Sequence, residues 1–140
     1  MMKKYELTNE TIEFRRRKLY RIRALRDFSN VKAGDLGGYI ESEENLSQDG
    51  LCWVSEDARV CGNAWVCDNT DYACISGFGR VQRTTTFFRT VDGTIGVACG
   101  CFTGSLDEFR AKVRETHGDS KFAKEYLMIA DLMEMHFKGE

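Results

Sequence analysis

The sequence contains no proline, only two histidines and no CxxC pair among its 140 residues. Since proline is missing, glycine, asparagine and aspartate must form the turns. The two histidines, His117 and His136, both lie in the C-terminal quarter. No apolar run is long enough to span a bilayer, and the first residues carry no apolar core of a secretory signal. We therefore expect a protein of the cytoplasm that does not enter a membrane.

The sequence also lacks a strong net charge, which is −2 at pH 7. This balance gives no general attraction to nucleic acid or to an anionic membrane. A hydrophobic content of 42% with 30% charged residues is typical of a globular chain. Six cysteines without a secretory signal are expected to be small buried residues and not disulfides. We expect no cofactor and no metal. A zinc site is an alternative, because Cys99 and Cys101 are expected to share one face of a strand.

The N-terminal part alternates between apolar and polar residues from position 4 to position 27, as antiparallel strands do. This pattern predicts a two- or three-stranded meander. A dense group of basic residues falls within it, and glycines at 34, 37 and 38 then predict a loop. The acids at positions 41, 43 and 44 are candidates to neutralise the basic group.

A six-residue repeat follows the meander. Bulky residues open each hexad at positions 54, 60, 66 and 72, and small residues stand four places later at 58, 64, 70 and 76. Helical periodicity does not produce a strict six, whereas a parallel β-helix built from hexapeptides does. Residues 38–81 are long enough for about two coils of such a solenoid. Its open ends require caps from the flanking segments.

The C-terminal part predicts a β-hairpin followed by two helices. Asp92-Gly93 is a strong turn signal between two strands, and Ser105 with Glu108 forms a capping box that starts a helix ending at Gly118. A second amphipathic helix is expected from about residue 119. The predicted fold is therefore α+β in one compact domain, with a meander over 1–37, a solenoid over 38–81, and a hairpin with two helices over 82–140.

Several segments carry a resemblance to a known family. They are YELTNETIEF and LYRIRALRDF, then GDLGGYIESEENLS, the hexads ARVCGNAWVCDN, and DGTIGVACGCFTGSLDEFRAKVRETHGDSKFAKEYL. Together they resemble a family of small phage and prophage proteins, whose members often carry tyrosine where Cys61 and Cys67 stand. The resemblance implies a phage context, which by analogy raises the expectation of an anti-CRISPR or other host-defence inhibitor.

From these features we expect a non-enzymatic interaction protein that binds and inhibits a host defence protein by steric occupation. No catalytic residue is predicted. Hexapeptide solenoids are best known from acyltransferases and carbonic anhydrases, but those enzymes need histidines at the coil, and the hexads have none. The predicted partner-binding residues are Arg15, Arg16, Arg17, Arg21, Arg23, Arg59 and Trp65.

The expected partner is a host protein or nucleoprotein complex in the cytoplasm of the host bacterial cell. Self-association into a homo-oligomer is also expected, because pairing would cover the open strand edges of a short solenoid. Two alternatives stay open at this point. One is a nucleic-acid-binding module that uses the basic stretch 15–26, and the other is a metal or enzyme site built on the cysteines.

Overall fold

The computed structural model describes residues 3–14, 16–55, 57–79, 83–100 and 102–138. Within this part the protein is a mixed α+β structure with two four-stranded sheets and two α-helices. The first sheet contains β1 (Tyr5–Phe14), β2 (Arg17–Ala24), β3 (Leu36–Ile40) and β4 (Arg59–Val60). The second contains β5 (Tyr72–Phe78), β6 (Arg83–Arg89), β7 (Ile95–Cys99) and β8 (Phe102–Ser105). The α-helices are α1 (Leu106–His117) and α2 (Lys121–Phe137), and single 3₁₀ turns span Glu43–Asn45 and Asn69–Asp71.

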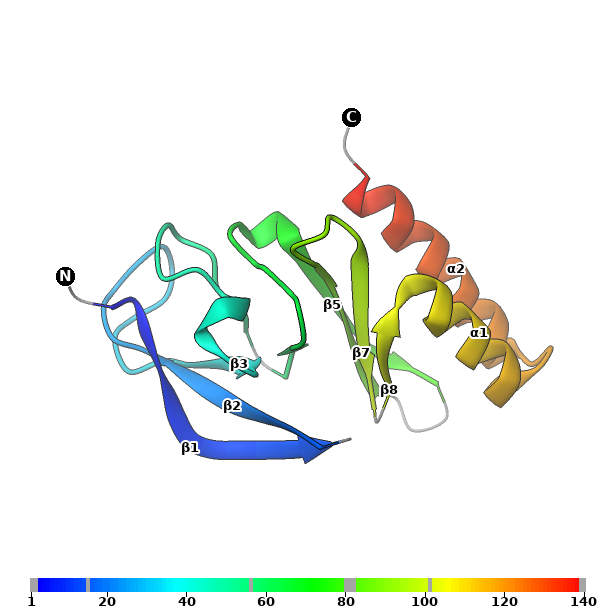
Figure 1. Cartoon of the computed structure of the whole chain (residues 1–140), viewed down its shortest axis with the longest axis horizontal. Coiled ribbons are helices and arrows are strands. Elements are labelled where there is room, and N and C mark those ends of the chain that lie inside the picture. The colour runs from blue at the N-terminus through cyan, green and yellow to red at the C-terminus, as the bar shows by residue number, and fades with distance from the viewer. Residues whose placement is uncertain (1–2, 15, 56, 80–82, 101, 139–140) are drawn as a thin grey trace.

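The two sheets define two lobes, which lie side by side with the helices at the far end of the molecule (Figure 1). We call residues 3–71 the first lobe and residues 72–138 the second lobe. In the first lobe, β1 pairs antiparallel with β2, and β2 pairs antiparallel with β3. The N-terminal antiparallel meander expected from the sequence is therefore present. The loop predicted at glycines 34, 37 and 38 is wrong in part, because Gly37 and Gly38 lie in β3, which pairs with β2 as the third strand.

The six-residue repeat of the first lobe corresponds to two columns of buried side chains. The members of these columns are Ile40, Leu46, Cys52, Val54, Ala58, Val60, Ala64 and Val66, and none is more than 2% exposed. Parallel pairing joins residues twenty positions apart, since 39 pairs with 59, 40 with 60, and 46 with 66. The first lobe thus contains one parallel return of the chain over itself, and these columns fill the space inside it.

The repeat ends after Val66, so the predicted extent of the solenoid is wrong. Thr70 and Ser76, the next members of the small-residue column, are exposed. Tyr72–Phe78 instead forms β5, which pairs antiparallel with β6 in the second sheet. The side-chain pattern of the segment YACISGF fits a repeat of two residues as well as a repeat of six. The strand that follows is rich in β-branched residues and pairs with this segment as a hairpin. Residues 80 and 81 of the predicted solenoid lie outside the described residues.

The second lobe contains the hairpin and helices that the sequence predicts. Gly93, with φ +79°, closes the turn between β6 and β7 by donating its N–H to the Thr90 carbonyl at 3.0 Å. Ser105 caps α1 through the Glu108 N–H, and the Glu108 side chain accepts the Ser105 N–H in return. Both helices cover one face of the second sheet (Figure 1), where Phe87 and Val97 belong to the same core as the helix residues.

The opposite face of the second sheet packs against the first lobe. Phe88 and Ala98 belong to the core of the first lobe, although they come from β6 and β7. Backbone contacts reinforce this junction, because Arg59 donates its N–H to the Thr86 hydroxyl at 2.9 Å and Trp65 donates to the Arg89 carbonyl at 2.9 Å. The shared core and these bonds fix the position of the two lobes relative to each other.

Among the described residues, the helices are too short or too polar for any of them to cross a membrane.

Candidate functional site

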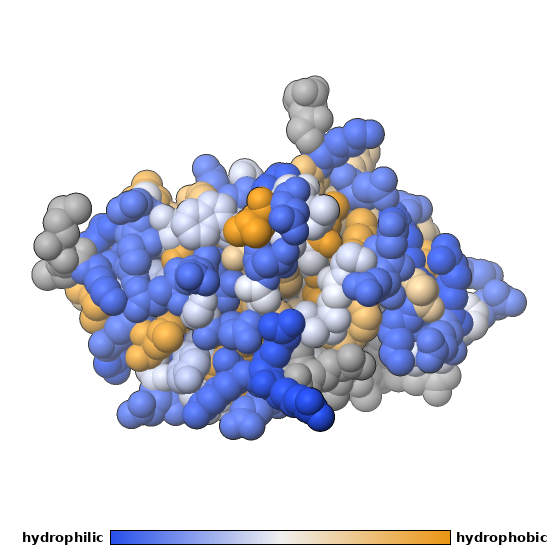
Figure 2. All heavy atoms as spheres, viewed as in Figure 1, coloured by the Kyte–Doolittle hydropathy of each residue, from blue (hydrophilic) through white to orange (hydrophobic). Residues whose placement is uncertain are grey.

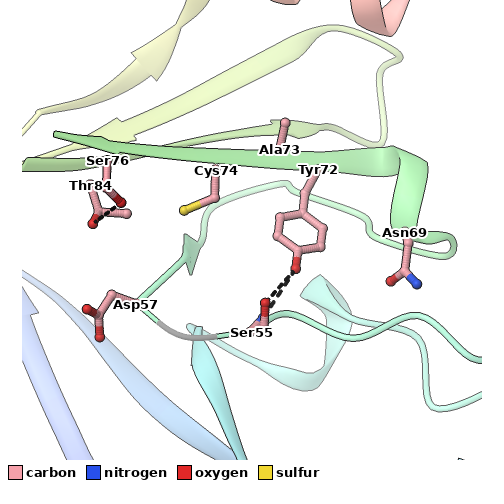
Figure 3. Close-up of a pocket in the computed structure, with 8 residues that line it drawn as sticks. All are labelled: Ser55, Asp57, Asn69, Tyr72, Ala73, Cys74, Ser76 and Thr84. Carbon is pink, nitrogen blue, oxygen red and sulfur yellow. Dashed lines mark hydrogen bonds between the residues drawn. The ribbon is translucent and has the colours of Figure 1, made fainter. Parts of the chain in front are cut away.

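A groove of about 340 Å³ lies between the edge strand β5 and the loop that precedes β4. We call it the Tyr72 groove (Figure 3). Its lining combines hydroxyl groups, one carboxylate, one amide and one thiol, and the residues are Ser55, Asp57, Asn69, Tyr72, Ala73, Cys74, Ser76 and Thr84. Small-molecule sites are usually lined mainly by apolar side chains with a few polar groups, so this mostly polar groove suits a polar ligand.

The alternation of β5 explains why these side chains meet. Tyr72, Cys74 and Ser76 project from one face of the strand toward the loop that carries Ser55 and Asp57 (Figure 3). Residues at odd positions, such as Ile75, pack on the helix side of the sheet. Since successive side chains of a strand point to opposite faces, one short sequence supplies both a core and a polar groove wall.

Hydrogen bonds hold most of the groove's polar side chains in place. The Tyr72 hydroxyl accepts the Ser55 N–H at 3.2 Å and lies 3.3 Å from the Ser55 hydroxyl. The Ser76 and Thr84 hydroxyls lie 3.0 Å apart, which ties β5 to β6. The Asn69 side-chain oxygen accepts the Trp53 N–H at 2.9 Å. These contacts leave the groove preorganised, because its walls come from segments that are already bonded to one another.

Asp57 gives the lining of the Tyr72 groove a negatively charged carboxylate. Its side chain is 75% exposed and lies 3.6 Å from the guanidinium of Arg21. Arg21 is itself held by Glu10 at 3.0 Å and by the Gly37 carbonyl at 2.7 Å, and it stacks 4.4 Å above the Tyr39 ring. The groove therefore presents a carboxylate at its rim beside a guanidinium that is fixed by the first lobe.

A second hollow of about 320 Å³ adjoins the first, since Ser55, Asn69 and Tyr72 line both. It adds the apolar side chains of Leu51 and Trp53. Trp53 is nearly buried and contacts Phe28 edge to face, with 5.4 Å between ring centres. The Tyr72–Ser55 bond thus separates a polar hollow from one with an apolar wall.

A third hollow of about 280 Å³ includes Arg17, Cys61 and Thr103. The Cys61 thiol lies 3.5 Å from the Thr103 hydroxyl, and burial raises the pKa of this thiol above its ordinary value. Because the thiolate is the reactive form, this cysteine is poorly suited to act as a nucleophile.

Three of the six predicted partner-binding arginines, Arg17, Arg21 and Arg23, make ion pairs inside the first lobe. Arg17 pairs with Glu41 at 2.8 Å, and Arg23 pairs with Glu6 across β1 and β2. Arg16 is exposed at the turn between these strands, with φ +68°. Arg15 lies outside the described residues. Figure 2 shows strongly hydrophilic side chains gathered over the β1–β2 hairpin, and the ion pairs mean that this surface carries acids as well as bases.

The remaining two predicted residues lie apart from the hairpin. Arg59 donates to the Gly100 carbonyl at 3.0 Å, so it bridges the two lobes. Trp65 is 42% exposed. Arg59 of β4 and Arg21 of β2 pair with the same residue of β3, Tyr39, so these two predicted residues lie two strands apart in one sheet.

Among the described cysteines, Cys52 and Cys61 are buried whereas Cys67 and Cys74 are exposed. Cys99 accepts a hydrogen bond from Thr85 at 3.1 Å, and Cys101 lies outside the described residues. In the described ranges, no three side chains of His, Cys, Asp or Glu cluster closely enough to hold a metal ion.

Tyr72, Ser55 and Asp57 were not among the candidate residues predicted from the sequence. A signal for the first of them exists, since Tyr72, Cys74 and Ser76 alternate with apolar residues as one face of a strand does. No sequence signal places the loop of Ser55 and Asp57 opposite that face. His117 is not part of the groove, since its ring stacks on Tyr126 with 5.9 Å between centres, on the helix side of the second sheet.

The chain was compared with known proteins. No family model matches it. It is 36% identical over 104 residues to a protein of Escherichia coli (strain K12) named the uncharacterized acetyltransferase YdcK. The match covers 69% of this chain but only 29% of the length of that protein.

This match overturns the prediction of a non-enzymatic inhibitor that acts by steric occupation, because the similar protein is named an enzyme. The prediction failed because the hexads lack histidine, and that absence was taken to exclude the acyltransferases that use hexapeptide coils. Histidine is not required of every acyl-transfer site, since other groups can bind and orient the acceptor.

Proposed function

We propose that this chain is part of an enzyme that transfers an acyl group from a thioester to an amine or hydroxyl acceptor. The observation that carries the proposal is the 36% identity over 104 residues to a protein named an acetyltransferase. Since the chain spans only 29% of that relative, the reaction, the donor and the acceptor are all parts of the proposal.

We further propose that residues 36–66 form one coil of a hexapeptide solenoid. The two buried columns at six-residue spacing and the parallel pairing of 39 with 59, 40 with 60 and 46 with 66 support this. A regular coil of three hexads takes roughly 18 residues. The return here takes twenty residues, since 40 pairs with 60, and Gly50, with a φ of +73°, lies in a turn within it. Such coils are the framework of a large class of acyltransferases, so the coil agrees with the proposed reaction.

We assign the acyl acceptor to the Tyr72 groove. Its hydroxyls and the Asn69 amide suit an acceptor with several hydrogen-bonding groups, and Asp57 suits an acceptor that carries an amine. In the transfer, the acceptor nitrogen or oxygen attacks the thioester carbonyl and the carbon–sulfur bond breaks. The departing sulfur takes up the proton that the acceptor loses and leaves as a thiol. The groove would contribute chiefly by orienting the acceptor, an effect that enzymes use to lower barriers substantially.

The test has two parts. Calorimetric titration with coenzyme A and with acetyl-coenzyme A measures donor binding, and mass spectrometry of reactions with amino sugars, amino acids and polyamines detects acetylated products. We expect Asp57→Asn to lower kcat/KM for an amine acceptor roughly tenfold, as the loss of one charge-assisted hydrogen bond does. Asp92→Asn, at the exposed turn between β6 and β7, is the matched control. The absence of both donor binding and acetylated product would remove the proposal.

The predicted phage context, the host partner and the cytoplasmic location stay predictions.

A further inference from the structure

Residues 51–55 border both the Tyr72 groove and the second hollow with side chains that alternate. Cys52 and Val54 are buried in the core of the first lobe, and the other side chains of this segment line the hollows. A turn follows at once, because Ala58 donates its N–H to the Ser55 carbonyl at 3.2 Å. The lining side chains therefore change in chain order from apolar to hydroxyl to carboxylate, as Leu51, Trp53, Ser55 and Asp57.

The apolar end of this series is open to a ligand. Leu51 is 59% exposed at the second hollow, which Val31 and Trp53 also line. Covering this leucine would remove apolar surface from water, so the hollow favours a ligand with an apolar group. An aromatic ring suits it best, because a ring can also make an edge contact with the indole of Trp53.

Two hydrogen-bond donors at the second hollow have no partner within the described ranges. They are the indole N–H of Trp53 and the side-chain nitrogen of Asn69, whose oxygen accepts the backbone N–H of Trp53. Asn69 is exposed, and the indole nitrogen is not fully buried, so both donors reach the surface. A ligand that covers a donor without returning a hydrogen bond loses affinity. The occupant of this hollow is therefore expected to carry an oxygen acceptor.

The carboxylate end of the series keeps a net negative charge. Asp57 is the charged side chain among the described residues that line the two hollows. Arg21 lies 3.6 Å from Asp57 but closer to Glu10, at 3.0 Å, so one guanidinium faces two carboxylates. A cation beside Asp57 would complete the pairing of charges, which favours an ammonium group at this end.

We infer that the two hollows together bind an arylalkylamine that carries an oxygen on its ring, and that this amine is the acceptor in the proposed acyl transfer. Its ammonium group pairs with Asp57, its short chain crosses the Tyr72–Ser55 bond, and its ring oxygen accepts from the donors of the second hollow. Figure 3 shows that this bond lies between Asn69 and Asp57, where the two ends of the site meet. The role as acceptor rests on the proposed function, whereas the binding does not.

Other amines match the lining less well. An amino sugar offers no apolar group to Leu51. A polyamine would place a second ammonium group in the second hollow, where none of the described lining residues carries a negative charge. The order of the lining side chains therefore selects one class among the amines that the proposed reaction leaves open.

Calorimetric titration of the full chain without a thioester tests the ligand class. The probes are tyramine, which has the ring oxygen, phenethylamine, which lacks it, and glucosamine, which lacks the aromatic ring. We expect tyramine to bind roughly tenfold more tightly than phenethylamine, since one hydrogen bond is lost, and glucosamine to bind more weakly still. Tyramine that binds no more tightly than either of the other two, or not at all, would overturn the inference.

Two substitutions test how the ligand lies. Asp57→Asn should weaken tyramine binding roughly tenfold and leave the binding of p-ethylphenol, which lacks the amine, unchanged. Leu51→Ser should weaken tyramine binding roughly three- to tenfold through lost apolar contact. Leu132→Ser is the matched control and should bind tyramine as before, because Leu132 is 51% exposed on α2, on the far side of the second sheet. Unchanged tyramine binding in Asp57→Asn or in Leu51→Ser would overturn the inference.

Mass spectrometry of reactions with acetyl-coenzyme A separates this inference from the proposed function. Acetylated tyramine is the expected product. Tyramine that binds while no amine is acetylated would overturn the proposed function, and with it the acceptor role, but would support the ligand site. Acetylation of glucosamine by a chain that does not bind tyramine would overturn the inference and support the proposed function.

Discussion

The hydroxyl of Tyr72 lies 3.2 Å from the backbone nitrogen of Ser55, which joins the first residue of β5 to the loop before β4. This bond connects the two lobes at the rim of the proposed acceptor groove. It also separates the polar hollow from the one that Leu51 and Trp53 line. One phenol therefore shapes both hollows.

Tyr72→Phe tests this relationship. The ring is kept, but the Ser55 N–H and hydroxyl lose their partner and turn to water, which is accessible at this rim. We expect a loss of about 1 kcal/mol in the free energy of unfolding and a larger relative loss of acyl-acceptor binding. Denaturant titration and acceptor titration measure the two effects. Tyr20→Phe, on a partly exposed tyrosine of β2, is the control and should change neither.

The buried columns of the first lobe predict that shortening two different valines to alanine changes the free energy of unfolding by different amounts. Val66 is fully buried in the column, whereas Val91 is 65% exposed in the turn after β6. Val66→Ala should lower the free energy of unfolding by about 2 kcal/mol, through lost burial and the cavity left behind. Val91→Ala should change it by less than about 0.5 kcal/mol. Equal effects in urea unfolding would contradict the inward orientation of the column.

Gly38 is required by the close approach of β3 to the chain that returns beside it. A Cβ atom at this position would lie 2.6 Å from the Ala58 carbonyl oxygen and 2.8 Å from a Val54 methyl group. The backbone oxygen cannot move without disturbing the parallel pairing, so Gly38→Ala should destabilise the protein by about 2 kcal/mol or more. Thermal unfolding measures this loss. A variant as stable as the original protein would show that the two segments are less tightly stacked.

Lys4 is a fully buried lysine with hydrogen-bond partners in the first lobe. Its ammonium donates to the Cys52 carbonyl at 2.7 Å and to the Asp49 carbonyl at 3.3 Å. Lys4→Met removes these donors and leaves the Cys52 carbonyl without this bond, at an expected cost of about 2–4 kcal/mol. Lys3→Met is the control, since Lys3 makes an exposed pair with Glu43, and it should cost less than about 1 kcal/mol. Similar denaturation midpoints for Lys4→Met and Lys3→Met in guanidinium would contradict this prediction.

The phenol of Tyr5 is expected to make the stability of the fold depend on pH in the alkaline range. Burial, and then the nearby charges of Glu43 and Cys52, raise the pKa of its phenol well above the ordinary value of about 10. The folded state holds this proton more tightly than the unfolded state, so the stabilisation is complete below pH 10 and is lost as the pH rises above it.

Tyr5→Phe should therefore flatten the fall of Tm above pH 10. The same variant loses the 2.7 Å bond to the Leu46 carbonyl, so its Tm at pH 7 should be lower. Calorimetric scans from pH 7 to the alkaline range separate the two effects. Parallel curves for the two proteins above pH 10 would contradict the role of Tyr5.

Local signals in the sequence predicted several elements correctly. The Ser105–Glu108 capping box and the Asp92-Gly93 turn depend on residues within a few positions of one another, so their geometry follows from local chemistry. The inward columns from Ile40 to Val66 were also predictable, because a fixed spacing of apolar residues defines a buried face.

The candidate site was not predictable in the same way. The Tyr72 groove brings together a strand of the second lobe and a loop of the first, and no local signal specifies that contact. The ion pairs of the basic stretch were not predictable for a similar reason. Arg17, Arg21 and Arg23 are paired with acids from other strands, and those partners are known only when the register is known.

The sequence by itself determined the α+β composition, the capped helix, the hairpin turn and the inward face of the repeat, because each depends on short-range spacing and backbone preference. Only the tertiary structure decided that Tyr72 leaves the repeat and begins a second sheet. The segment YACISGF fits both a coil and an antiparallel strand, and pairing with β6 chose between them. That choice placed the tyrosine opposite Ser55 and formed the groove, since strand pairing over a distance fixes which faces meet.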